Sequence, residues 1–186
     1  MKVNSETLLS ELTQKTKENI YLAEALKAKS DSELNWRSAP TSWSILECLE
    51  HLNLYGDFYL PEIERVIQKA TIKSDPVFKS VFLGNYFAES MLPKEKVNKM
   101  KTFKDKNPLN SNLSRITIDR FINQQKKMLE FLNQSRTISL NKEKTQISIT
   151  RWIKLKIGDT FLFVINHNIR HLKQIESVID LKTAIR

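Results

Sequence analysis

Residues 43–52 read WSILECLEHL, which combines the start of a helix with the first turns of an apolar face. Ser44 and Glu47 have the spacing of a capping box, in which the serine oxygen accepts from a free backbone N–H and the glutamate reaches back. From Ile45 to Val66 the apolar side chains recur at intervals of three and four residues. Pro61 should bend this helix, because a proline there removes one backbone hydrogen bond. The spacing predicts an amphipathic helix over residues 44–70.

Three other stretches carry the same periodicity: residues 5–28, residues 114–135, and the stretch that follows Gly158-Asp159. The 186-residue chain has only 3 glycines and 5 prolines, too little turn punctuation for a sandwich, a barrel or a glycine-rich nucleotide loop. Four amphipathic helices bury their apolar stripes most simply in a four-helix bundle. We therefore predict an all-α fold that forms a single domain over residues 1–186.

The predicted second and third helices are separated by an irregular insert, residues 71–111. Its first part, residues 77–91, could be a short helix that lines or covers a pocket, with four aromatic side chains that either form the pocket wall or belong to the core: Phe78, Phe82, Tyr86 and Phe87. Its second part, residues 94–106, carries six lysines. Later in the chain, residues 136–150 alternate polar and β-branched side chains, and we expect them to be extended.

The chain has 30 basic and 21 acidic residues, for a net charge of +9. Such a field permits contact with nucleic acid, but a lysine run in a loop is usually a solvated surface, and no recognition-helix motif accompanies it. The start of the sequence lacks the apolar stretch of a secretory signal, and the run at residues 161–165 is too short to cross a bilayer. We expect a cytoplasmic protein with no membrane partner, and the sequence supports binding to nucleic acid less well than it supports a solvated basic surface.

The chain contains 3 histidines, and all of them fall within predicted helices. His167 and His171 are four residues apart, so they lie on one face of the last helix. His51 flanks the apolar stripe of the 44–70 helix. If these two helices face each other, three neutral imidazoles converge, a donor set that suits zinc or nickel and leaves positions open for water or substrate. The alternative is that each histidine is an ordinary residue of the core.

Two segments resemble the DinB/YfiT-like superfamily. One comprises residues 34–37 together with residues 43–52, and the other runs from Gly158 through HNIRHLKQI at residues 167–175. The resemblance implies a four-helix bundle that binds a divalent metal through His51, His167 and His171. It also implies a transferase that uses a low-molecular-weight thiol such as bacillithiol, and a homodimer.

A thiol is nucleophilic only as its thiolate, and a cation on three uncharged imidazoles lowers the pKa of a thiol or a water molecule. We therefore expect a divalent-metal-dependent transferase or hydrolase that activates a low-molecular-weight thiol, or water, for attack on a small electrophile. The alternatives are a non-catalytic metal-binding bundle of the stress response and, more remotely, a protein that binds nucleic acid.

Metal-bound histidines usually donate their second N–H to a carboxylate or carbonyl. Glu47 precedes His51 by one turn, although its role in the capping box competes, and Gln174 follows His171 by three residues. These two residues are the candidates for hydrogen-bond partners of the histidines, and the alternative is that each has an ordinary structural role. Cys48 could approach the ion, but a free cysteine more often packs as a small apolar side chain.

Overall fold

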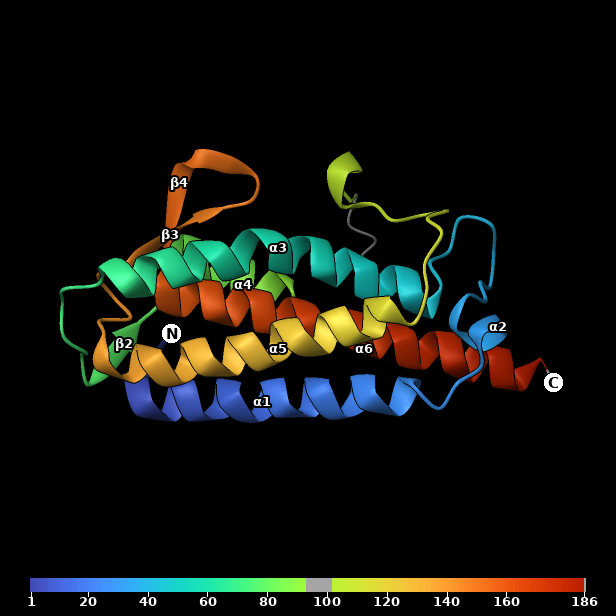
Figure 1. The fold of residues 1–186 in the computed structure, drawn as a ribbon. Coiled ribbons are helices and arrows are strands. Elements are labelled where there is room, and N and C mark those ends of the chain that lie inside the picture. The colour runs from blue at the N-terminus through green and yellow to red at the C-terminus, as the bar shows by residue number, and fades with distance from the viewer. Residues whose placement is uncertain (93–101, 186) are drawn as a thin grey trace.

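The computed structural model describes residues 1–92 and 102–185, and four long helices dominate this part of the chain (Figure 1). They are α1 (Ser5–Leu26), α3 (Ile45–Lys69), α5 (Ile116–Gln134) and α6 (Ile157–Ala184). The closest packing joins α1 to α5, α5 to α3, α3 to α6 and α6 to α1, so the helices follow one another around the bundle in that order. The predicted four-helix bundle is confirmed, and α3 and α6 are neighbours in it.

The helix starts follow from local hydrogen bonding. At the start of α3 the Ser44 Oγ accepts from the Glu47 N–H at 3.2 Å, and the Glu47 Oε2 accepts from the Ser44 N–H at 2.8 Å. Both halves of the predicted capping box are therefore present. Asn4 caps α1 by accepting from the Thr7 N–H at 3.0 Å. Pro61 lies within α3, which continues past it to Lys69.

Apolar side chains fill the bundle in two clusters. One cluster includes Leu9, Phe131 and Phe161, and the other includes Leu49, Phe121 and Leu172. Along both α3 and α6 the clusters follow one another; on α6 His167 and His171 fall between them, and on α3 His51 lies near the end of the Leu49 cluster that faces the other cluster. The bundle therefore buries the histidines in the middle of its length.

Two small antiparallel sheets are added to the bundle. In the first, β1 (Lys2–Asn4) pairs with β2 (Val77–Lys79). In the second, β3 (Lys144–Ile147) pairs with β4 (Thr150–Lys156), with a register irregularity after Gln146. The stretch predicted to be extended, residues 136–150, is thus a strand only over its later part, and it begins with the short 3₁₀ helix η2 (Ser135–Thr137). In Figure 1 the β3–β4 hairpin projects from the bundle.

The remaining helices are short. Helix α2 (Asp31–Leu34) begins at a second capping box, which Ser30 and Glu33 make. Helix α4 (Phe82–Ser90) lies in the insert, packed against α6. The 3₁₀ helix η1 (Lys104–Lys106) includes the last two of the six lysines, and the other four lie outside the described residues.

The aromatic side chains of the insert do not line one pocket. Phe78 is fully buried in the core, whereas Phe82 is 90% exposed and Tyr86 is 61% exposed. Phe87 packs against Phe163 of α6 with their ring centroids 6.4 Å apart. Of the two alternatives, the four rings form neither a shared wall nor a shared part of the core, because α4 turns Phe82 and Tyr86 outward while Phe78 is in the core.

Within the described residues, every helix is either too short or too polar to span a lipid bilayer.

Candidate metal centre

The three histidines meet at one point between α3 and α6. The His167 Nε2 lies 3.2 Å from the His51 Nε2 and 3.1 Å from the His171 Nε2. The three side chains are buried, with exposed fractions of 3% for His51, 5% for His167 and 9% for His171. Among the described residues they form the one group of histidine, cysteine or carboxylate side chains arranged to hold a metal ion.

The imidazoles are neutral near pH 7. Burial lowers the pKa of His51 to about 4 and that of His171 to about 3, and it places the pKa of His167 well below its usual range. For His51, the hydrogen bond to the Lys106 backbone opposes this lowering of the pKa, and the Lys106 ammonium adds a smaller lowering; the Arg170 charge lowers the pKa of the other two histidines slightly. Neutral imidazole is the form that binds a metal, since its lone pair is free.

Two of the histidines have their protons fixed by acceptors. The His51 Nδ1 lies 2.6 Å from the backbone oxygen of Lys106, and the His171 Nδ1 lies 2.9 Å from the Gln174 Oε1. Both oxygens accept, so each neutral ring carries its hydrogen on Nδ1. Each Nε2 is then left with a lone pair, and these lone pairs face the cluster centre.

Hydrogen bonds among the three histidines cannot pair all of their Nε2 atoms, and a cation could bind the lone pairs that remain. His167 can donate one Nε2 hydrogen to one neighbour at most, so at least one Nε2 faces another nitrogen at close to 3 Å without a proton between them. A tetrahedral zinc with Zn–N bonds of about 2.0–2.1 Å sets its nitrogens about 3.3–3.4 Å apart. Three imidazoles are also the donor set of zinc sites that keep a position open. The residues present therefore fit a divalent metal.

Aromatic rings surround the histidines. The Trp43 ring lies 4.7 Å from His51 and 5.8 Å from His171 between centroids, and Tyr55 lies 4.6 Å from His167. Phe163 stacks on His167 at 5.9 Å. Burial raises the pKa of Tyr55 to about 12, so its phenol stays protonated and can donate a hydrogen bond.

The three other candidate residues from the sequence, Glu47, Cys48 and Gln174, lie in different surroundings. Gln174 contacts His171, as described above. Glu47 does not contact a histidine: its carboxylate accepts from Arg37, from the Ser44 N–H and from the Asn110 N–H. Cys48 is fully buried in the apolar cluster around Leu49, where burial raises its thiol pKa, and it lies outside the histidine group.

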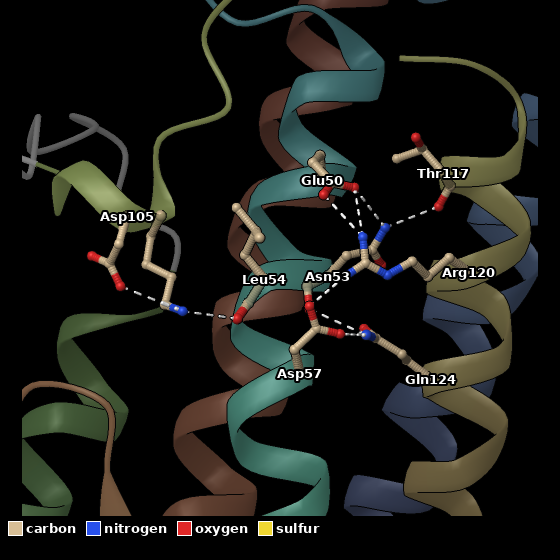
Figure 2. A network of polar contacts seen from close by, with 9 residues as sticks. Glu50, Asn53, Leu54, Asp57, Asp105, Thr117, Arg120 and Gln124 are labelled. Atoms are coloured by element: carbon tan, nitrogen blue, oxygen red, sulfur yellow. Dashed lines mark hydrogen bonds and ion pairs between the residues drawn. The ribbon is translucent and has the colours of Figure 1, made fainter. Parts of the chain in front are cut away.

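A polar network fixes α3 against α5 (Figure 2). The Arg120 guanidinium bridges the carboxylates of Glu50 and Asp57 on α3. Two amides add contacts to the backbone across the interface: the Gln124 Nε2 donates to the Asn53 oxygen at 3.1 Å, and the Asn53 Nδ2 donates to the Thr117 oxygen at 3.1 Å. The network holds the helix that carries His51.

Sequence reasoning missed the partner of His51. That partner is the backbone oxygen of Lys106. Every residue has a backbone oxygen, so the sequence pattern does not indicate which one contacts His51. The asparagines that follow, Asn107 and Asn110, contact the start of α3 and were also missed. The one signal for them was the Asn107-Pro108 pair, which marks a loop without showing where that loop lies.

Comparisons with known proteins agree with this fold. The family described as the DinB superfamily matches residues 12–175. The chain is similar to a solved structure of YfiT from Bacillus subtilis, described as "a probable metal-dependent hydrolase with an unusual four-helix bundle topology". The two are 12% identical with a TM-score of 0.58, over 94% of this chain and 87% of the other. No curated protein matches the chain. At this identity the likeness concerns the fold.

Proposed function

The chain belongs to the DinB superfamily, and from this membership and its histidine cluster we propose that it is a divalent-metal-dependent hydrolase. The observation that carries the proposal is the convergence of three buried Nε2 atoms, two of them held as lone-pair donors by acceptors on Nδ1. YfiT, which has a similar fold, is described as a probable metal-dependent hydrolase, which supports the same class of reaction.

His51, His167 and His171 would hold the ion, and zinc or nickel suits three imidazoles. A divalent cation bound there supplies Lewis acidity, which lowers the pKa of a water molecule or thiol so that a nucleophile forms near neutral pH. The chain's own residues do the rest. Burial keeps the imidazoles neutral, Gln174 and the Lys106 carbonyl orient two of them, and the protonated Tyr55 phenol offers a hydrogen-bond donor beside them.

In hydrolysis, the oxygen of water forms a bond to an electrophilic carbon while the bond to the leaving group breaks with its electron pair. One proton of water is released and balances the charge of the leaving group. The rings of Trp43 and Phe163 pack against His51 and His167, which gives the surroundings of the proposed metal centre an apolar character. We therefore propose a small electrophile with an apolar portion as the substrate.

The finer proposal is that a low-molecular-weight thiol replaces water. Lys106 and Arg170 bring positive charge near the histidines, and this charge would favour an anionic co-substrate. A thiol that bears carboxylates fits this field. Its sulfur would bond to the electrophilic carbon, the leaving group would depart with the electron pair, and the thiol proton would pass to solvent.

Metal analysis of the purified protein tests the proposal. We expect about one divalent metal per chain in the wild type and loss of the metal in His167→Ala. Lys173→Ala, an exposed neighbour on α6, is the control and should retain the metal. A wild type that binds no metal, or a His167→Ala variant that binds it equally well, would overturn the proposal.

Turnover then separates the nucleophiles. The metal-loaded protein is incubated with an activated ester or halide, with and without bacillithiol. Product formed in water alone supports the hydrolase, and product that requires the thiol supports the transferase. Bound metal with neither product would favour the non-catalytic bundle.

A further inference from the structure

A segment far from any histidine in the sequence closes one side of the cluster. This segment, residues 103–110, which we call the strap, contains η1 and the loop after it. Its contacts go to Arg37 and Trp43, which precede α3, and to the first turns of α3. Three strap residues make them, namely Lys106, Asn107 and Asn110.

Lys106 ties the strap to α3 at two points. Its backbone oxygen accepts from the His51 Nδ1 at 2.6 Å, and its Nζ donates to the Leu54 oxygen at 3.1 Å. Figure 2 shows the second contact, together with the ion pair between the same ammonium and Asp105. The contact between the Lys106 Nζ and Leu54 fixes the position of the strap along the axis of α3. The Lys106 backbone oxygen is thereby placed next to His51.

Asn107 ties the strap to Trp43, one of the aromatic rings that surround the histidines. Its Oδ1 accepts from the Trp43 Nε1 at 3.1 Å and from the Leu109 N–H at 3.2 Å. The Trp43 ring in turn contacts both His51 and His171. One amide oxygen therefore orders the loop and holds the indole against two of the three histidines.

Asn110 ties the far end of the strap to the capping box of α3. Its φ of 68° is left-handed, a conformation that asparagine tolerates better than most residues. Its N–H donates to the Glu47 Oε1 at 2.6 Å, and its Oδ1 accepts from an Arg37 nitrogen at 2.6 Å. Glu47 is 1% exposed and is bound to the Ser44 N–H, so this anchor is itself rigid.

From these contacts we infer that Asn107 and Asn110 are positioning residues of the proposed metal centre. They hold the strap so that the Lys106 oxygen keeps the His51 proton on Nδ1 and the Nε2 lone pair on the cluster centre. This inference rests on the proposed function, so its first test measures the affinity of the protein for a metal. Losing an outer partner of a metal-bound histidine typically weakens metal binding by about 10–100-fold.

The test compares Asn107→Ala with Asn107→Asp. Aspartate keeps an oxygen that accepts from Trp43 and Leu109, whereas alanine has none. We expect zinc affinity, measured by competition with a chromogenic chelator, to fall about tenfold or more in Asn107→Ala and to stay within about threefold of wild type in Asn107→Asp. Asn112→Ala, an exposed asparagine just beyond the strap, is the control. Cobalt(II) absorption bands should change in the alanine variant alone.

Asn110 provides a second, independent pair. Glycine adopts the left-handed backbone readily and alanine does not, while both lose the Arg37 contact. We expect zinc affinity to decrease in the order wild type, Asn110→Gly, Asn110→Ala. Equal affinities for wild type, Asn107→Ala and Asn110→Ala would overturn the inference, as would an Asn107→Asp variant as weak as Asn107→Ala.

A metal-free readout separates this inference from the proposed function. Nitrogen-15 chemical shifts of the His51 ring report which nitrogen carries the hydrogen. We expect the Nδ1–H form in the wild type and a mixture of the two forms in Asn107→Ala. If the wild type binds no metal, the proposed function fails, yet this shift still supports the strap. An unchanged His51 signal in the alanine variant would contradict it.

Discussion

Replacing Glu47 by alanine should destabilise the bundle more than replacing any exposed glutamate. The carboxylate of this 1% exposed residue accepts from the Arg37 Nε at 2.9 Å and from a second Arg37 nitrogen at 2.5 Å. It also accepts from two backbone N–H groups, those of Ser44 and Asn110. Four donors therefore lose their acceptor in one substitution.

The magnitude follows from these contacts. Breaking a buried ion pair by removing one partner costs about 3–5 kcal/mol. The Arg37 side chain is 28% exposed, so water can replace part of what it loses, which argues for the lower end of that range. Loss of the reciprocal half of the capping box adds up to about 1 kcal/mol. We expect the free energy of unfolding to fall by about 3–4 kcal/mol.

Urea unfolding followed by far-ultraviolet circular dichroism measures this difference. Glu47→Gln keeps one accepting oxygen and should lose only about 1–2 kcal/mol. Glu11→Ala, on the exposed face of α1, serves as the control and should lie within about 0.5 kcal/mol of wild type. A Glu47→Ala variant that loses less than about 1 kcal/mol would refute the reasoning, because the carboxylate would then not be satisfying buried donors.

Three further outcomes are expected. The metal-free protein should lose stability as the pH falls from about 6.5 toward 4. Burial lowers the folded-state pKa of His51 to about 4 and that of His171 to about 3, so the histidines of the unfolded chain bind protons first as the pH falls. Urea midpoints that are equal at about pH 7.5 and about pH 5 would contradict this. Cys48 is fully buried with a raised thiol pKa, so iodoacetamide should label it in urea but not in the native protein, and rapid native labelling would show that the core opens there. Gly84→Ala should cost about 1–3 kcal/mol in urea unfolding, since the added methyl group would lie 2.2 Å from the buried Asp159 carboxyl carbon, and unchanged stability would show that α4 can shift at no cost.

The helices were predictable because each carries its own signal. The capping box at Ser44 and the apolar stripe that follows it are local, and they define the start of α3 without reference to the rest of the chain. The spacing of His167 and His171 likewise places both on one helix face. That His51 would join them required only that α3 and α6 be neighbours, which the bundle provides.

The parts that escaped prediction depend on contacts distant in sequence. Leu155 in β4 is buried and pairs with Thr145 across the hairpin, and a short strand of this kind has little periodicity of its own. Glu47 looked like a partner for His51 because both lie on α3, but Arg37 and Asn110 engage its carboxylate instead. The acceptor that His51 does use is a backbone oxygen 55 positions away, at Lys106.

The most direct test of the three-histidine centre is X-ray absorption at the zinc edge on the zinc-loaded protein. We expect three imidazole nitrogens at about 2.0–2.1 Å from the metal, and loss of this imidazole signature in His167→Ala. A sulfur shell near about 2.3 Å would instead place Cys48 on the metal. A spectrum without imidazole scattering would contradict the assignment of His51, His167 and His171 as the ligands.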